Sequence, residues 1–515
     1  MKNDVLIDDQ KKKSLTVTNL IWMGFTVVWG FGNVVNNYAN QGLAVITSWI
    51  FIMALYFIPY SLMVGELGST FKEGQSGLSY WIKQTMGPLL AYLSGWTYWV
   101  VHIPYLAQKP QNLMVAGSWA IFRNPKMVKS LNPIVLQALV LIIFLLFVLL
   151  AANGIKSIKV LGSIAGTASF VMGILFILLM LAAPALRGVE VASPNMTSIK
   201  TYLPNFNLHY LTTISMLVFA VGGCEKISPY VNDTQDAGKN FPKAMLIMAL
   251  MVTVSAILGS VAMGMMFDTT NVANDLKMNG AYYAFEKLGQ YYGIGSSLVI
   301  IYALTNFAGQ AAALVMSIDA PLKLLLSEAD AKYVPNFLRK INDKKVPVGG
   351  YKLTTILVSI LIIIPALGIG NSNELYNWLL DLNSIVMPMR YMWVFAAYFA
   401  LKHYLHEKQG VEYRFTKSKS FGKFIAGWCF LFTAFACILG MIPKEGEPFT
   451  SQWNFKLMLN ILTPVVLLGL GLILPSIAKK EQAKNIWKLK IISYKSYMKM
   501  LVGCQKIADY FCDII

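Results

Sequence analysis

Of the ionisable residues inside long apolar stretches of this 515-residue chain, four stand out: Glu225, Asp319, Arg390 and His102. A charged side chain at the centre of a bilayer costs roughly 2.5–3.5 kcal/mol on insertion scales, so each residue is a candidate for charge or proton chemistry. Glu225 is the leading candidate, because its carboxylate could bind an ammonium group or carry a coupled proton. The alternative is a structural ion pair between Glu225 and a basic residue of another helix.

Asp319 and Arg390 each leave two interpretations open. Asp319 precedes Ala320-Pro321 and is expected near the cytoplasmic mouth, either as the gate partner of a basic residue or as a structural group. Arg390 follows Asp381 in one stretch, and a helical repeat puts the two about 180° apart, so they are not expected to pair. Arg390 therefore binds either a carboxylate ligand or one of the acids Glu225 and Asp319.

His102 and Lys109 share an apolar stretch with Pro104 and Pro110. Two prolines predict a kinked helix, and a kink beside polar groups is typical of a cavity wall. Imidazole titrates at about pH 6.5, so His102 could report acid pH, although a hydrogen-bonded packing role is the commoner outcome. Lys109 is expected near the external end of the stretch, with its ammonium reaching the membrane interface.

Two apolar stretches are interrupted by glycines. The runs are Trp29-Gly30-Phe31-Gly32-Asn33 and Phe219-Ala220-Val221-Gly222-Gly223, the second directly before Cys224-Glu225. Each glycine weakens a helix by about 0.8–1 kcal/mol relative to alanine. Non-helical backbone survives in hydrocarbon only where it lines a cavity, and breaks at corresponding positions of two halves are typical of inverted-repeat transporters. The alternative is that these glycines only allow close helix packing.

Membrane-spanning helices are needed to position these residues. Hydrophobic residues make up 56% of the chain and charged residues 13%, about half the share of a soluble domain. About 20 apolar residues cross a bilayer. Twelve stretches of sufficient length predict an all-α membrane protein with 12 transmembrane helices: 15–36, 44–67, 87–122, 134–152, 160–183, 210–230, 243–267, 292–326, 351–369, 376–401, 421–442 and 457–476.

The net charge of +18 is distributed as in a membrane protein rather than a nucleic-acid-binding one. Most of the 43 Lys and Arg residues fall in segments predicted to be cytoplasmic, including 11–13, 339–345 and 402–423. Basic flanks stay on the cytoplasmic side, so both termini are expected there. The first apolar stretch is too long for a signal peptide and is expected to remain as a span.

The predicted organisation is a cytoplasmic N-terminal segment 1–14, a transporter domain 15–476 and a basic cytoplasmic tail 477–515. In the tail, apolar residues recur at intervals of three or four, which indicates an amphipathic helix. They are Trp487, Ile491, Tyr494, Met498, Leu501, Cys504, Ala508 and Phe511. Such a basic helix is expected to lie on an anionic leaflet, and the alternative is a plug of the cytoplasmic entrance.

The sequence motifs do not indicate a metal site, a cofactor site or an enzyme active site. The five cysteines have no metal-binding spacing, so neither a metal nor a cofactor is predicted. HExxH, GxSxG and Walker patterns are absent from the sequence, and no catalytic residue is assigned.

Three runs of residues resemble the APC (amino acid–polyamine–organocation) superfamily, with closest likeness to its glutamate/GABA antiporter branch. The first run contains Phe57-Ile58-Pro59, Gly65-Glu66-Leu67-Gly68-Ser69 and Gly87-Pro88. The second runs from Gly223-Cys224-Glu225 to Pro242-Lys243-Ala244, and the third contains Asp319-Ala320-Pro321 and Val334-Pro335. The family's GxGIF-type run in the first span is replaced by Trp29-Gly30-Phe31-Gly32-Asn33, which weakens the substrate assignment more than the fold.

The resemblance implies a LeuT-like fold, in which inverted repeats of five helices (about 15–183 and 210–401) are followed by two additional helices. Helices 1 and 6 would be unwound at the midplane. The carboxylate and amino groups of a substrate would bind the backbone at Gly30 to Asn33 and at Ala220 to Gly223, beside Trp29. Phe219 stands at the position of the aromatic residue that covers the substrate.

The resulting functional hypothesis is an amino acid antiporter of the plasma membrane that works by alternating access. Alternatives are a proton-coupled importer, an importer of cationic amino acids or polyamines, and an amino acid sensor without transport. Expected partners are an amino acid and the lipid bilayer, and no nucleic acid; the oligomeric state stays open.

Overall fold

The fold is taken from a computed structural model. It describes residues 15–73, 77–153, 156–268, 271, 273–328, 330, 332–342, 346–405 and 411–512. The predicted cytoplasmic segment 1–14 lies outside the described residues. The regular secondary structure within them is helical, and the β-bridges found there are isolated: Leu15 with Thr234 and Ile341 with Pro347.

Long apolar runs form helices because hydrocarbon offers no partner for backbone polar groups, and a helix satisfies them internally. In the described part of the chain, nine helical segments are long and apolar enough to cross a membrane. Two shorter apolar helices, Val17–Val28 and Val348–Ile363, accompany them. The prediction of a multi-pass, all-helical membrane protein is confirmed at this level.

The first half of the chain contains ten α-helices and three other short helical turns. Their bounds are α1 (Val17–Val28), α2 (Phe31–Gln41), η1 (Gly42–Ala44), α3 (Val45–Ile52), the π-helical η2 (Met53–Phe57), α4 (Ile58–Thr70), α5 (Leu78–Met86), α6 (Pro88–Val100), α7 (His102–Phe122), α8 (Lys126–Lys129), α9 (Pro133–Ala152), α10 (Lys156–Arg187) and η3 (Ile199–Tyr202).

The second half continues with α11 to α20. Their bounds are α11 (Leu208–Ala220), η4 (Cys224–Tyr230), α12 (Ala237–Met266), α13 (Leu276–Tyr291), α14 (Ser297–Glu328), α15 (Asn336–Arg339), α16 (Val348–Ile363), η5 (Ile364–Leu367), α17 (Ser372–Val386), η6 (Met387–Arg390), α18 (Tyr391–Tyr404), α19 (Lys419–Gly440) and α20 (Ser451–Cys512).

The predicted kink of the third stretch lies at Val101, between α6 and α7. Pro104 explains its position, because proline has no N–H to donate to the carbonyl of Val100 one turn earlier. Pro110, by contrast, is accommodated inside α7. The kink therefore comes just before His102, which begins α7.

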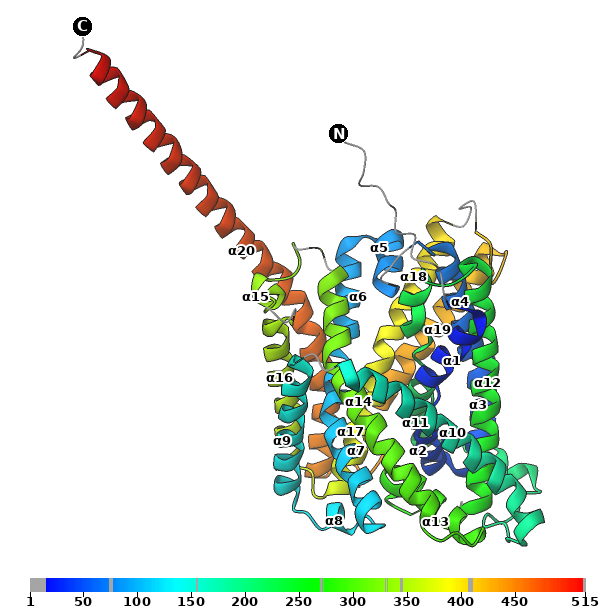
Figure 1. The fold of residues 1–515 in the computed structure, drawn as a ribbon. Coiled ribbons are helices and arrows are strands. Elements are labelled where there is room, and N and C mark those ends of the chain that lie inside the picture. Colours follow the sequence, from blue (N-terminus) through cyan, green and yellow to red (C-terminus); the bar gives the residue numbers. More distant parts are fainter. Residues whose placement is uncertain are drawn as a thin grey trace.

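The helices form one bundle whose two ends differ (Figure 1). At one end lie α5 and the start of the described chain, and at the other lie α8 and α13; we call these the α5 end and the α13 end. The outer helices turn apolar side chains outward: Ile142, Leu146 and Leu149 of α9 are 54%, 55% and 62% exposed. A surface of this kind is suited to lipid.

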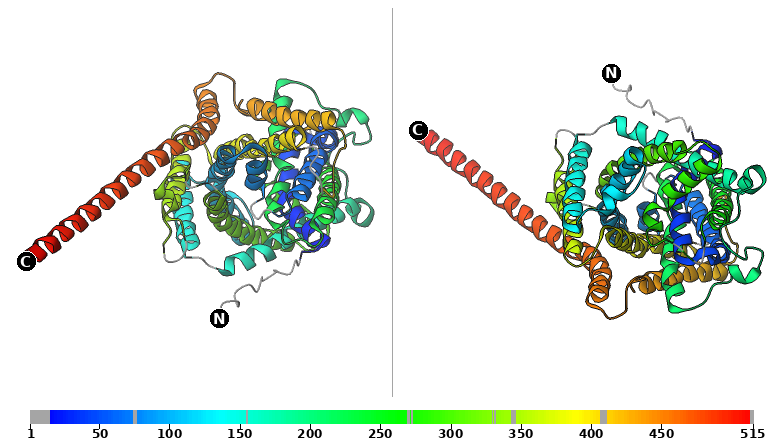
Figure 2. Two further views of the ribbon diagram at one scale, coloured as in Figure 1. Left: turned by 90° about the horizontal axis from the view of Figure 1, so that it is seen from above. Right: turned by 90° about the horizontal axis from the view of Figure 1, so that it is seen from below.

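Helix α20 runs from Ser451 to Cys512 and joins the predicted last span to the predicted tail without a break. Its far part leads away from the bundle rather than across the α5 end, as two further views also show (Figure 2). The side chains of the predicted apolar stripe after Trp487 lie outside the described residues. Nothing in this backbone path covers the bundle as a plug would.

At the α13 end, Asp275 holds the start of α13 against the loop that contains α8. Its carboxylate accepts from Lys129 (2.5 Å), Tyr283 (2.8 Å) and Asn279 (3.0 Å). Burial alone would raise the pKa of Asp275, but the hydrogen bonds from Lys129 and Tyr283 outweigh it and hold the pKa below the usual 3.8.

Candidate functional site

A cavity of about 390 Å³ lies where the two glycine-containing breaks meet. Its walls come from both breaks and from helices α7, α10, α13, α14 and α17. Of the predicted site residues, those that line it are Trp29, Gly30, Phe31, Gly32, Asn33, Phe219, Gly222 and Arg390. Ala220, Val221, Gly223, Glu225, His102 and Asp319 are not among its lining residues.

The first break separates α1 from α2. Trp29 (φ −75°, ψ 138°) and Gly30 (φ −154°, ψ 129°) are extended, and α2 begins at Phe31 without a side-chain cap. The amide of Asn33 donates to the carbonyl of Gly30 (2.9 Å). The first N–H groups of a helix have no partner within it and carry a partial positive charge, so this helix end suits a carboxylate.

The second break separates α11 from η4. Gly223 has φ +113°, a backbone conformation that glycine adopts without a steric penalty. At Gly222, an added Cβ would lie 1.9 Å from the Tyr391 ring, so glycine is required by close packing. The Asn33 side chain donates to the carbonyl of Ala220 (3.3 Å) and connects the two breaks directly.

Glu225 and Arg390 form an ion pair in which Arg390 lines the cavity and Glu225 does not. Arg390 Nε lies 3.0 Å from Glu225 Oε1, and the two side chains are 2% and 0% exposed. The N–H direction is poor, because neither atom makes an aligned hydrogen bond within the described part of the chain. Tyr60 Oη donates to the other Glu225 oxygen. Of the alternatives for Arg390, the structure shows the bridge to Glu225.

His102 also contacts the Arg390 guanidinium. Its Nδ1 is 2.7 Å from the carbonyl of Tyr98, and its Nε2 is 3.4 Å from Arg390 Nη1. With Nδ1 as donor, Nε2 is left as an acceptor facing a cation, which is the arrangement of a neutral imidazole. The contacts agree with the packing interpretation of His102.

Asp319 lies apart from the cavity. Its carboxylate contacts Lys323 one turn later (2.7 Å) and accepts from Tyr351 of α16 (2.8 Å). Asp381 likewise does not pair with Arg390, as expected, and instead contacts Lys444 (2.8 Å).

The cavity wall is strongly basic. Its lining residues include Lys109, Lys226, Lys277 and Arg390, and no Asp or Glu occurs among the lining residues that the structure describes. Arg390 is paired with Glu225, and Lys277 with Glu445 (2.8 Å). Two cations thus face the cavity without an acidic partner among the described residues.

The prediction for Lys109 was wrong. Instead of reaching the membrane interface, Lys109 is buried on the cavity wall, donates to Gln310 (2.5 Å) and lies 4.3 Å from the Tyr105 ring centroid. The signal that could have placed it is the polar run Gln108, Gln111 and Asn112 around it. These amides extend over a whole helical turn and would be costly against lipid.

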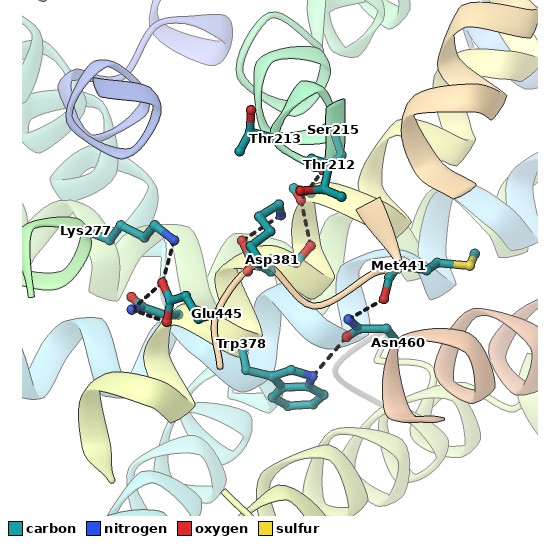
Figure 3. A network of polar contacts seen from close by, with 12 residues as sticks. Thr212, Thr213, Ser215, Lys277, Trp378, Asp381, Met441, Glu445 and Asn460 are labelled. Atoms are coloured by element: carbon teal, nitrogen blue, oxygen red, sulfur yellow. Dashed lines mark hydrogen bonds and ion pairs between the residues drawn. The ribbon is translucent and has the colours of Figure 1, made fainter. Parts of the chain in front are cut away.

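A polar network lies toward the α13 end and includes Lys277, which also lines the cavity (Figure 3). The loop 441–450, between α19 and α20, contributes two adjacent residues of opposite charge. Lys444 contacts Asp381 of α17, and Glu445 contacts Lys277 of α13, each at 2.8 Å. Asn377 also donates to Glu445 (3.1 Å). Burial lowers the pKa of the Lys444 ammonium, and the Asp381 carboxylate opposes that shift.

The network extends to the neighbouring helices. Asn460 of α20 accepts from Trp378 (3.0 Å) and donates to the carbonyl of Met441 (2.9 Å). Ser384 and Ser215 connect α17 to α11 (3.1 Å).

Among the residues that the structure describes, no group of three or more His, Cys, Asp or Glu side chains gathers as metal ligands would.

The chain resembles known proteins along most of its length. The family model described as amino acid permease matches residues 15–467. The chain is 52% identical to the aspartate/glutamate permease AcaP of Lactococcus lactis subsp. cremoris, over 93% of this chain and 97% of the relative. It is 23% identical to the inner membrane transporter YjeM of Salmonella typhimurium, over 86% and 92% of the two chains.

A more distant relative is the glutamate/gamma-aminobutyrate antiporter of Lactococcus lactis subsp. lactis, 22% identical over 79% of this chain and 80% of the relative. These matches confirm the predicted superfamily and the prediction that the protein is not an enzyme. The chain belongs to the amino acid permease family of the APC superfamily, and it is an amino acid transporter.

Proposed function

We propose that the protein transports acidic amino acids, aspartate and glutamate. The observation that carries this proposal is the charge of the cavity wall, where the described lining residues include four cations and no acid. An ion in a low-dielectric site needs a counter-charge, and a dicarboxylic amino acid supplies one. The name of the relative at 52% identity, an aspartate/glutamate permease, supports the same substrates.

The broken helices are proposed to bind the groups that all amino acids share. The α-carboxylate would bind the start of α2 between Gly30 and Asn33, because these residues line the cavity and the first N–H groups of a helix suit an anion. The ammonium would bind carbonyls of the break from Ala220 to Gly223, since no carboxylate lines the cavity in the described chain. Phe219, on the cavity wall, would cover the substrate, with Trp29 and Phe31 nearby.

The charged residues that do not line the cavity are proposed to act without contacting the substrate. Glu225 is proposed as the counter-ion of Arg390, which leaves the lysines to give the cavity its excess positive charge. His102 holds the guanidinium in place, and Asp319 acts outside the substrate cavity.

The proposed architecture has twelve spans in a LeuT-like arrangement of inverted repeats, 15–183 and 210–401, with two further helices. It is supported by the interruptions after Val28 and after Ala220, which fall in the first and sixth predicted spans. We propose a plasma-membrane location with both termini in the cytoplasm, so that the α5 end is cytoplasmic and the α13 end external. Alternating access then exposes the cavity to each side in turn.

Uptake into proteoliposomes tests this proposal. Labelled aspartate and glutamate are offered to the purified full-length protein, with unlabelled aspartate, glutamate, arginine, putrescine and leucine as competitors. The expected result is uptake that only aspartate and glutamate inhibit strongly. Inhibition by arginine or putrescine instead would refute the substrate class and favour a cationic substrate.

Vesicle loading identifies the coupling in the same assay. Uptake that requires internal glutamate or GABA would establish exchange, as in the antiporter hypothesis. Uptake into empty vesicles driven by a proton gradient would establish a proton-coupled importer. Binding of aspartate without flux under either condition would contradict transport of acidic amino acids.

A further inference from the structure

Lys226 occupies a distinctive place on the cavity wall. It follows the second break directly, in η4, and its amide donates to the carbonyl of Gly223 (3.0 Å). Its Cδ and Cε atoms lie 3.7 Å from the position that a Cβ of Gly223 would take. The aliphatic stem therefore folds back over the glycine, and the residue lines the cavity.

The four basic residues of the wall are not equivalent. Arg390 and Lys277 each contact a carboxylate, and Lys109 donates to Gln310. Lys226 makes no side-chain hydrogen bond or ion pair with any residue that the structure describes. It is thus the cation on the wall whose hydrogen-bonding capacity is left for a ligand.

An ammonium that is half-buried and unpaired is unfavourable until an anion binds it. The start of α2 is already suited to one carboxylate, and it lies on the wall of the same cavity as Lys226. A dicarboxylic amino acid has a second carboxylate on its side chain, whereas asparagine and glutamine have an uncharged amide in its place.

We propose that Lys226 binds the side-chain carboxylate of the substrate and thereby selects acidic over amide side chains. This inference rests on the proposed function, and it adds the residue that recognises the side chain of the substrate. An amide substrate would leave the ammonium without a counter-charge, and a site that leaves a buried polar group unpaired rejects such a ligand strongly. Lys109, already bound to Gln310, would contribute to the field of the cavity rather than to the contact.

The test compares aspartate with asparagine in the full-length protein in proteoliposomes. The measured quantity is the ratio between the inhibition constant of asparagine and that of aspartate, against labelled glutamate. Lys226→Gln is expected to lower this ratio at least tenfold, the effect of losing one charge-assisted hydrogen bond. Lys226→Arg, which keeps the charge, is expected to retain most of the preference.

Lys109→Gln is the matched comparison, because it removes the same charge from the same wall. It is expected to change the ratio less than Lys226→Gln does. Lys226→Met is measured in parallel, with size-exclusion chromatography of each variant, so that misfolding of one substitution does not decide the result.

The outcomes separate this inference from the proposed function. If the wild-type protein transports neither aspartate nor glutamate, both fail. If it transports them and Lys226→Gln and Lys226→Met weaken aspartate and asparagine equally, only the role of Lys226 is overturned. A larger loss of preference in Lys109→Gln than in Lys226→Gln would move the selecting role to Lys109 and also overturn the inference.

Discussion

Replacement of Glu225 by glutamine tests whether the buried ion pair stabilises the bundle. At 3.0 Å, two unit charges attract by about 5–6 kcal/mol if the effective dielectric constant is about 20. Removal of one partner leaves the other charge buried, which costs roughly 3–5 kcal/mol. Arg390 has no replacement acid nearby in the described chain, since its other side-chain contacts there are with His102 (3.4 Å), Tyr391 (3.5 Å), Met387 (3.6 Å) and the Tyr98 ring.

A double-mutant cycle measures this interaction. Glu225→Gln, Arg390→Met and the double variant are purified, and the free energy of unfolding is measured by detergent titration in mixed micelles. Each single variant is expected to lose about 3–5 kcal/mol, whereas the double variant should lose much less because no unpaired charge remains. The expected coupling energy is therefore at least about 2 kcal/mol.

The pair Lys72 and Glu412 provides the control. Both side chains are 33% exposed, so their coupling energy is expected to be at most about 1 kcal/mol. A coupling energy for Glu225 and Arg390 no larger than this control would refute the reasoning. It would mean that the poorly directed N–H of Arg390 contributes as little as a surface contact does.

Three further predictions concern packing, pH and the tail. Gly222→Ala should lower the free energy of unfolding by about 1–3 kcal/mol, because its methyl group collides with the buried Tyr391 ring. Gly32→Ala is the control, because its methyl group meets no atom within 4 Å and should not destabilise the protein. The thermal midpoints of the two variants are compared. Because the folded pKa of Asp275 is lowered, its stabilising effect is fully present above about pH 4 and is lost only as the pH falls through the folded pKa. The thermal midpoint of Asp275→Asn should thus lie below that of the wild type equally at pH 7 and pH 5, and a gap that closes by pH 5 would contradict this. Deletion of 485–515 should leave the uptake rate per molecule and its pH profile unchanged, since α20 leads away from the bundle (Figure 1); a changed profile would favour the plug.

Hydropathy and glycine spacing predicted the helical membrane fold and the interruption of the first span, because both features depend on residues within one helix. An interruption at Trp29 and Gly30 is predicted by two glycines in an apolar run, and α1 ends at Val28 while α2 begins at Phe31. The run before Glu225 likewise predicted a second break beside the first. The bridge between Asn33 and Ala220 could not be predicted, because it depends on how two distant helices meet.

The charge of the cavity was the main feature that sequence reasoning missed. Lys109 looked like an interfacial lysine, because hydropathy does not show which face of a helix meets lipid. No role could be assigned to Lys226 from the sequence, where it directly follows Glu225. Lys277 was not predicted as a site residue, because it lies between two predicted spans. In the structure it lines the cavity. Each of these positions follows from tertiary packing, which places separate cations around one space.

The unequal pairing of the wall cations has an electrical consequence under the proposed alternating access. With Arg390 and Lys277 neutralised, two uncompensated positive charges remain on the wall within the described chain, and a bound dicarboxylic amino acid reduces them to one. As the cavity passes from the external to the internal potential, each elementary charge is worth about 2.3 kcal/mol per 100 mV. If the carrier returns empty, the empty form therefore moves more charge than the loaded one, and the membrane potential acts mainly on that return step; an exchanger, which returns loaded, avoids it.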